Sequence, residues 1–385
     1  MSLSARSSAV GLGNPSLLTL PPVLHSAQPQ PDGDVYLINV MGAKGALNVA
    51  YTADKKLLTV GDTAGGIRVY KTGKSDELCC LSLQLAVQGR SRKHADKAEK
   101  PWAGKAVAVT CLRPWPMQPA EPTLLASYAD GKVRLWDVMH GVVKAVVTED
   151  RQCLGMAVAP DSSCFVTLGE DGGVHLYDAE TFQLVTKMEH SGFSDVVDGH
   201  KSRTFSGAFH PLDPNCVATG GWDNLIQFWD IRLAQSTRHC GDAHVGGTES
   251  LDFSANGNEL MSCSWRNNDQ LQIWDSASAT LIETLRPDRI KSYLYAGRYL
   301  SENMLCCGGS NANLFRLVHI GQKVTVGTIS GLAHGVFSIA LGPIGAQIRP
   351  NPSLNNGKNL LPHNKYKCPR VAVCSDSKVM ELEVY

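Results

Sequence analysis

Side chains of the types used in hydrolytic catalysis gather in the middle of this 385-residue chain, at His200, Thr219 and Asp223. A histidine oriented by a carboxylate can take a proton from a hydroxyl group, which is how many hydrolases activate a nucleophile. Trp229 follows ten residues after the threonine, and its indole N–H can donate to the same hydroxyl oxygen. The four groups can therefore satisfy one another when buried, as burial requires. This pattern favours a structural cluster over a catalytic one.

The elements that must position these side chains are short strands. Thr204 to His210 predicts an inner strand, Cys216 to Gly220 a second and Leu225 to Asp230 a third, because apolar and polar residues alternate along them. A turn at Gly221–Asn224 joins the last two. The aspartate thus lies in a turn, whereas the threonine and the tryptophan lie on neighbouring strands.

The third strand is one copy of a pattern that recurs along the chain. Each copy alternates in polarity and ends on an aromatic residue, usually followed by aspartate; the copies are Gly66–Tyr70, Lys132–Asp137, Gly173–Asp178, Leu225–Asp230 and Leu271–Asp275. The intervals of 41 residues from Trp136 to Tyr177 and 45 from Trp229 to Trp274 lie near the ~40–45-residue period of four-stranded propeller blades. Longer intervals indicate insertions. Two weaker copies, 313–317 and 378–382, bring the total to seven.

From about Asp34 to Tyr385 the chain resembles the WD-repeat β-propellers. The resemblance is carried by Trp-Asp pairs at 136–137, 229–230 and 274–275, by Tyr-Asp at 177–178, and by the turns at 129–131, 170–173 and 222–224. It implies an all-β, seven-bladed propeller. It also places His200, Thr219, Asp223 and Trp229 at the positions of the family's hydrogen-bonded tetrad.

Other copies depart from the tetrad. The copy ending at Trp274 has His244 and Ser262, but its turn at 264–270 is longer. The copy ending at Tyr177 has Thr167 and Asp171 without a preceding Gly-His. We expect these blades to depend more on apolar packing.

A closed ring must also join its ends. The C-terminal copy shows three strand-like runs, Val336–Leu341, Val371–Ser375 and Val379–Tyr385, and lacks a fourth. Asp34–Met41 alternates like a strand and precedes another at Ala46–Thr52. We predict that Asp34–Met41 completes the C-terminal blade and leaves no open sheet edge.

Composition narrows the class of protein. The formal net charge is zero, so no overall field favours nucleic acid or an acidic membrane as partner. The 12 cysteines show no metal-ligand spacing, and we expect neither a metal nor another cofactor. We read these cysteines as reduced, in a cytoplasmic or nuclear protein that is not secreted; association with the cytoskeleton stays open. No apolar run suggests a membrane-spanning helix. Residues 1–33 predict a flexible tail before a propeller spanning 34–385.

Insertions at 88–105, 190–204 and 342–370 exceed the minimal repeat. Two of them are basic, with Arg90, Arg92, Lys93, Arg349, Lys365 and Lys367. Such loops fit a solvated surface or an acidic protein partner. Nucleic acid is a weaker reading, because no aromatic residues suited to base stacking accompany the charges.

Two tryptophans occupy equivalent turn positions in adjacent copies, Trp222 and Trp265, and Arg266 follows the second. A large aromatic residue in an exposed turn has no core role, and Trp and Arg are enriched at binding hot spots. We predict that these three residues form part of a protein-binding patch on one face. Shielding of the tetrad is the alternative.

The segment Val217–Arg232 resembles the DWD box of propellers that dock onto the adaptor of cullin-RING ubiquitin ligases. Its distinguishing residue is Arg232, placed to reach an adaptor carboxylate. The chain shows no phosphate-binding loop, metal-spaced set or nucleophile motif outside the repeats. We therefore expect a non-catalytic scaffold or adaptor, monomeric as a propeller, within a multiprotein assembly. A substrate receptor of a cullin-RING ligase is the alternative.

Overall fold

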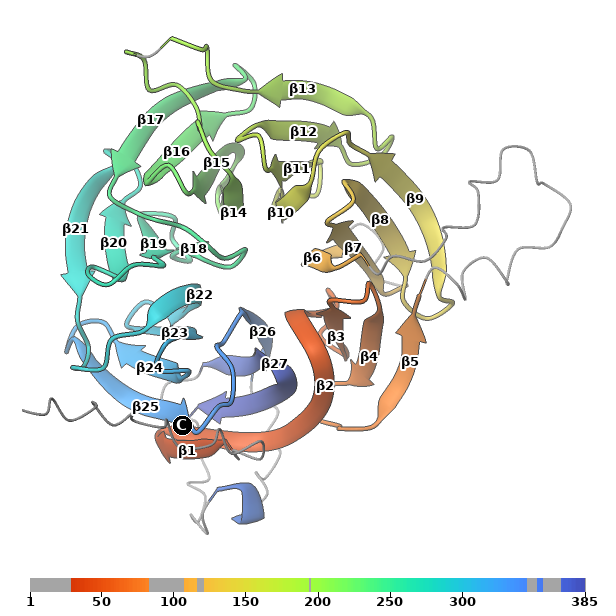
Figure 1. Cartoon of the computed structure of the whole chain (residues 1–385), viewed down its shortest axis with the longest axis vertical. Helices are drawn as coiled ribbons and strands as arrows, with labels where there is room; N and C mark the ends of the chain where they lie inside the picture. Colours follow the sequence, from red (N-terminus) through yellow and green to blue (C-terminus); the bar gives the residue numbers. More distant parts are fainter. Residues whose placement is uncertain are drawn as a thin grey trace, which may run out of the picture.

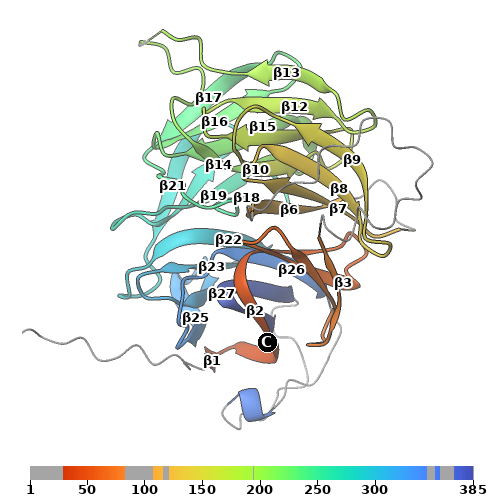
Figure 2. The same cartoon turned by 45° about the vertical axis from the view of Figure 1, so that its right-hand side comes forward.

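The computed structural model describes residues 29–82, 107–115, 121–193, 195–344, 352–355 and 368–384. Within these ranges every regular element is a β-strand, apart from the short 3-10 helix η1 (Pro352–Leu354). The strands form sheets arranged around a ring (Figure 1), and Figure 2 shows the same ring turned by 45°. The prediction of an all-β propeller is confirmed. No helix in the described ranges is long and apolar enough to cross a bilayer.

Four sheets each contain four antiparallel strands that follow one another in the chain. They are β6 (Val109–Trp115), β7 (Thr123–Tyr128), β8 (Lys132–Asp137) and β9 (Val142–Thr148); β10 (Cys153–Val158), β11 (Cys164–Gly169), β12 (Val174–Asp178) and β13 (Leu184–Met188); β14 (Thr204–His210), β15 (Asp213–Gly221), β16 (Leu225–Asp230) and β17 (Gln235–Gly241); β18 (Leu251–Phe253), β19 (Glu259–Cys263), β20 (Leu271–Asp275) and β21 (Thr280–Leu285). We call the sheets of β10–β13, β14–β17 and β18–β21 blades three, four and five.

The described strands form six hydrogen-bonded sheets, so the prediction of seven separate blades is wrong. The first and last repeat copies share one six-stranded sheet, in the order β26-β27-β2-β3-β4-β5. Its strands are β2 (Val35–Tyr51), β3 (Leu57–Asp62), β4 (Ile67–Lys71), β5 (Glu77–Leu81), β26 (Ser338–Ile344) and β27 (Pro369–Val384). The two copies fuse because β2 and β27 are each long enough to serve both.

Each of these long strands was predicted as two. The first part of β2 pairs with β27, from Val35 opposite Val384 to Gly42 opposite Lys378, and its second part pairs with β3. The ladder shifts register between Gly42 and Ala46, where Gly45 has a φ of +74°. Glycines let the chain bend there without ending the strand. The predicted pairing of Asp34–Met41 with the C-terminal blade is confirmed, and it closes the ring.

The N-terminal tail was predicted to end at residue 33, whereas the first strand of the structure, β1, begins at Gln30. β1 (Gln30–Gly33) pairs with β25 (Val324–Ser330) and becomes the fifth strand of a sheet that also contains β22 (Tyr293–Ser301), β23 (Met304–Ser310) and β24 (Phe315–His319). β1 therefore covers the edge of this sheet, which would otherwise offer unpaired backbone groups. Residues 1–28 lie outside the described residues.

The core lies between neighbouring sheets. Second strands such as β7 and β11 are buried along their whole length, whereas outer strands such as β9 alternate between exposed and half-buried positions. One apolar cluster joins Val166 and Leu176 of blade three to Phe209, Val217 and Trp229 of blade four. Each blade thus buries one face against the next, which commits the strands to packing and leaves the turns for other roles.

Ion pairs join distant inner strands. Glu249, just before β18, contacts Arg113 of β6 and Arg298 of β22. Arg298 also lies 3.2 Å from Asp252 of β18, between Nη1 and Oδ1. The Glu249 side chain is buried, so its charge depends on both arginines.

Candidate functional site

The tetrad side chains of blade four form one hydrogen-bonded chain. His200 Nδ1 lies 2.9 Å from Asp223 Oδ2, and its Nε2 lies 2.8 Å from Thr219 Oγ1. The Trp229 indole N–H donates to the same hydroxyl oxygen at 2.7 Å. Burial acts to raise the pKa of Asp223, but the hydrogen bond and charge of His200 outweigh it and the pKa is lowered. The hydroxyl engages both the imidazole and the indole, so the arrangement is that of a structural network.

Blade five does not repeat this chain. Trp274 Nε1 donates to Ser262 Oγ at 2.9 Å, but His244 Nδ1 lies 2.7 Å from Asn224 Oδ1, in the turn of blade four. Asn224 can adopt the required φ of +64° because asparagine tolerates the left-handed region. His244 is therefore directed toward the neighbouring blade instead of its own.

In this position His244 lies between the two tryptophans. Its ring centroid is 6.3 Å from that of Trp222, with planes 6° apart, and 6.4 Å from that of Trp265, with planes 28° apart. Further ring contacts extend the series at both ends, and we call the whole set the aromatic row: Phe205, Trp222, His244, Trp265, Tyr293, Tyr295 and Phe337.

Blade topology brings these rings together. Trp222 lies in the β15–β16 turn, Trp265 in the β19–β20 turn and His244 in the β17–β18 connection. The backbone N–H of Trp265 donates to the backbone carbonyl of His244 at 2.8 Å, which fixes that connection against the turn. A Cβ atom on Gly246 would lie 3.2 Å from Trp265 Cβ and 3.7 Å from Trp222 Nε1. A glycine at this position leaves the two indoles close to the connecting backbone.

Both indoles remain accessible. Trp222 and Trp265 are each 40% exposed, and the Arg203 guanidinium lies 5.6 Å from the ring centroid of Trp222. Burial and the charge of Arg266 lower the pKa of His244, which favours its neutral imidazole. The row is thus a partly apolar, uncharged surface with arginines beside it, a composition typical of protein-binding hot spots.

Arg266 occupies a more constrained place than the sequence suggested. Its Nη2 donates to Gln272 Oε1 at 3.0 Å, and its Nη1 lies 3.4 Å from Asp242 Oδ1. The guanidinium braces the β19–β20 turn that carries Trp265. The structure thus places Trp222 and Trp265 in one surface, with Arg266 as a neighbour of that surface.

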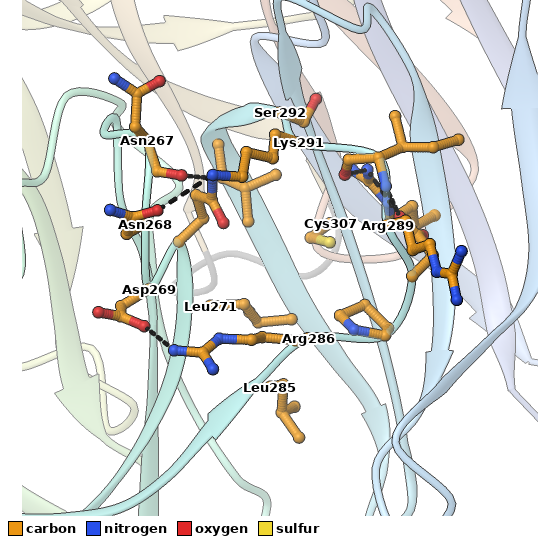
Figure 3. Close-up of a pocket in the computed structure, with 16 residues that line it drawn as sticks. Asn267, Asn268, Asp269, Leu271, Leu285, Arg286, Arg289, Lys291, Ser292 and Cys307 are labelled. Carbon is orange, nitrogen blue, oxygen red and sulfur yellow. Dashed lines mark hydrogen bonds and ion pairs between the residues drawn. The ribbon is translucent and has the colours of Figure 1, made fainter.

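A pocket of about 400 Å³ lies beside the aromatic row, between blade five and β22–β24 (Figure 3). Tyr293 of the row donates its hydroxyl to Asn267 Oδ1 at 2.8 Å, and Asn267 also lines the pocket. This hydrogen bond links the aromatic row to the lining of the pocket.

The remaining predicted residues do not join this site. The Arg232 guanidinium is bound to Asp230 within its own box, at 3.0 Å from Nε to Oδ1 and 2.7 Å from Nη2 to Oδ2. The basic residues Arg90, Arg92, Lys93, Arg349, Lys365 and Lys367 lie outside the described residues. No cluster of three or more potential metal ligands occurs among the residues that the structure describes.

Sequence reasoning missed most of the row. His244 was assigned to a tetrad, and Phe205, Tyr293, Tyr295 and Phe337 were not singled out. A signal existed, since Phe205, Tyr293 and Phe337 each lie within two residues of the beginning of an inner strand. Inner strands begin on one face of the ring, so aromatic residues at that position gather on it.

Comparison with known proteins agrees with the repeat pattern of the sequence. Residues 101–137 and 193–230 match the family described as "WD domain, G-beta repeat". Similar chains include the target of rapamycin complex subunit wat1 of Schizosaccharomyces pombe, 24% identical over 55% of this chain and 64% of that protein. The APC/C activator protein CDC20 of Saccharomyces cerevisiae is 24% identical over 56% of this chain and 33% of its own length. A striatin homolog of Dictyostelium discoideum is 27% identical over 45% and 21%. The chain spans less than two thirds of each.

Proposed function

We propose that this chain, a WD-repeat β-propeller, acts as a scaffold or adaptor and binds a partner protein through the aromatic row. The observation that carries the proposal is the stack of Trp222, His244 and Trp265, which leaves both indoles 40% exposed. Large aromatic side chains held in place by neighbours lose little conformational entropy on binding and anchor interfaces well.

The rigidity of the stack supports this role. Each indole has ring contacts on two sides: Trp222 with Phe205 and His244, and Trp265 with His244 and Tyr293. Their exposed faces are therefore preorganised, which lowers the ordering cost that association must overcome. Shielding of the tetrad alone does not explain a row that continues through Tyr295 to Phe337.

The relatives support the same class. By their names, wat1 is a subunit of a target of rapamycin complex and CDC20 activates the APC/C. Both names describe proteins that work within assemblies. All twelve cysteines are free, which supports a reducing compartment, the cytoplasm or the nucleus.

The row supports the proposal better than the box at 217–232. The Arg232 guanidinium forks onto Asp230, and docking onto a ligase adaptor would require it to leave that carboxylate. We therefore place the partner on the face of the aromatic row.

The test is a double variant, Trp222→Ala with Trp265→Ala, compared with Leu212→Ala plus Leu233→Ala. Leu212 and Leu233 are 71% and 61% exposed at the β14–β15 and β16–β17 turns, at the opposite end of blade four from Trp222. Affinity capture with quantitative mass spectrometry should show partners lost from the tryptophan variant and kept by the leucine variant. Both variants must melt as cooperatively as the unaltered protein. A tryptophan variant that folds and retains every partner would overturn the proposal.

A further inference from the structure

We propose that Arg113 of β6 is a positioning residue for the aromatic row, although its own sheet contributes no ring to the row. This inference rests on the proposed function and concerns what keeps that binding surface in place. Arg113 acts through the connection between β17 and β18, which carries His244 near one end and Glu249 near the other. In Figure 1, β6 and β18 face each other across the middle of the ring.

The inner end of this connection is bound by strands of three sheets. Arg113 donates from Nη1 to the Glu249 carboxylate and from Nη2 to the Thr248 carbonyl, the latter at 3.3 Å. The Ser206 hydroxyl of β14 donates to the same carbonyl at 3.2 Å. The backbone N–H of Gly297 in β22 donates to the Glu249 carbonyl at 2.9 Å. Residues from around the ring therefore meet at Thr248 and Glu249.

The contact between Arg113 and the connection is largely buried. The Glu249 side chain is 2% exposed and that of Arg113 is 14% exposed. A guanidinium is a planar fork of donors, so binding a carboxylate and a carbonyl together restricts the position of both. Arg113 thus ties the connection to the sheet of β6–β9.

The outer end of the same connection is attached to both tryptophan-bearing turns. The His244 carbonyl accepts the backbone N–H of Trp265, as described above. The backbone N–H of Val245 donates to the carbonyl of Gly221, the residue before Trp222, at 3.1 Å. Three residues, 245–247, separate His244 from the inner end of the connection.

These intervening residues are packed against their neighbours. A Cβ atom on Gly247 would lie 2.1 Å from the Tyr295 carbonyl oxygen, and one on Gly246 would lie 3.2 Å from Trp265 Cβ. The backbone therefore contacts β22 and the β19–β20 turn directly. Closely packed interiors transmit displacements, so a shift of the inner end must move His244 or the turn that carries Trp265.

Arg134 offers a matched control for a general loss of stability. It lies on β8, in the same sheet as Arg113, and its side chain is 4% exposed. Its Nη2 lies 3.9 Å from Asp130 Oδ2, and its guanidinium lies 4.3 Å from the ring centroid of Tyr128. These partners belong to its own sheet, so its loss should perturb that sheet without displacing the connection.

The experiment compares Arg113→Met with Arg134→Met in the full-length protein labelled with 5-fluorotryptophan. Trp222→Phe and Trp265→Phe assign the two fluorine resonances of the row. We expect Arg113→Met to shift the Trp265 resonance by more than its linewidth and Arg134→Met to leave both resonances unchanged. In affinity capture, Arg113→Met should lose the partners that the Trp222→Ala, Trp265→Ala variant loses, and Arg134→Met should keep them.

Both arginine variants must melt cooperatively. If Arg113→Met does not, Arg113→Lys takes its place, because an ammonium group is a point charge without the planar fork of a guanidinium. Unchanged fluorine resonances in the Arg113 variant would overturn the inference, as would equal shifts in the Arg113 and Arg134 variants. Full retention of partners by the Arg113 variant would also overturn it when the tryptophan variant loses them. Failure of the proposed function gives a different result: the tryptophan variant keeps every partner, and the fluorine resonances alone then decide the inference.

Discussion

Blades three and four solve the same packing problem with different chemistry. Blade four links Asp223 to Trp229 through His200 and Thr219. Blade three has Thr167, Asp171 and Tyr177 at the equivalent positions, but an ion pair takes the place of the histidine.

The ion pair is formed by Glu149 and Arg151. Glu149 Oε1 accepts hydrogen bonds from the hydroxyls of Thr167 and Tyr177, the latter at 2.7 Å. Arg151 Nε donates to Glu149 Oε2 at 2.7 Å, and its Nη1 donates to Asp171 Oδ1 at 2.6 Å. Two carboxylates cannot bond to each other when ionised, so the guanidinium must stand between them.

The comparison shows that the blade backbone determines where the buried hydrogen-bonded network lies, but not which side chains form it. In blade four a single imidazole spans the gap between the turn carboxylate and the threonine. In blade three two opposite charges span it, and both are buried. Charges need compensation more strictly than neutral groups do when water is excluded, so the two blades should respond differently to substitution.

The largest effect is expected for Arg151→Ala. It removes the arginine that pairs with the buried Glu149 carboxylate, and removing one partner of a buried ion pair typically costs about 3–5 kcal/mol of folding free energy. Urea denaturation at neutral pH measures the change. A loss of unfolding free energy smaller than that of a blade-four variant would contradict the proposed difference between the two blades.

The corresponding blade-four variants should lose less. His200→Ala removes a hydrogen-bond partner from Asp223 and from Thr219, and Asp223→Ala removes one from His200. Leaving such a buried polar group unsatisfied costs about 1–3 kcal/mol of folding free energy. The same denaturation series provides the measurement, with the exposed Leu233→Ala as control. Unchanged stability in both variants would show that the hydrogen-bonded chain does not contribute to folding.

Acid should act on blade three through Glu149. Burial acts to raise its pKa, but the hydrogen bond of His175, the charge of Arg151 and the hydroxyls of Thr167 and Tyr177 outweigh burial and lower the pKa to about 2, from an ordinary 4.5. A depressed pKa contributes stability that is fully present above pH ~4.5 and is lost as pH falls toward 2.

The matched variant for this effect is Glu149→Gln, which cannot titrate. The stability gap between the two proteins, from thermal melts at a series of pH values, should be widest near neutral pH and narrow below pH ~4.5. A gap that stays constant with pH would contradict the ionic role of Glu149.

The smallest effect is expected where the same kind of ion pair is exposed. The Arg232 side chain is 66% exposed and pairs with Asp230. Solvent screens such pairs, so Arg232→Ala should change the free energy of unfolding far less than Arg151→Ala does. A loss as large as that of Arg151→Ala would show that burial does not account for the difference between the two pairs.

Local alternation predicted much of this fold. The strands expected at Thr204–His210 and Leu225–Asp230 coincide with β14 and β16, because one face of each is buried and the period is two. The long strands β2 and β27 were each predicted as two shorter strands. The alternation of apolar and polar residues is interrupted where each strand changes its pairing from one neighbouring strand to another. β1 was missed because its residues gain order only from pairing with β25.

The candidate site was predictable in part for a different reason. Trp222 and Trp265 were found because a large apolar side chain in a turn conflicts with the local pattern. His244 was misplaced because the repeat frame assigns it to a tetrad, whereas Asn224 of the neighbouring blade holds it. The ion pair of Glu149 and Arg151 was hard to predict. Its only indication in the sequence is two opposite charges spaced by two residues, just before an inner strand. A contact between two blades depends on residues of both repeats, so the pattern of one repeat does not predict it.

The most direct test of the aromatic row is site-specific photo-crosslinking. A photoreactive phenylalanine analogue replaces Trp265 in one protein and Leu233 in another, and each is irradiated in the cell before denaturing purification. The account predicts one or more discrete crosslinked partner bands from position 265 and none above background from position 233. Equal crosslinking at both positions, or at position 233 alone, would contradict the assignment of the row as the partner-binding surface.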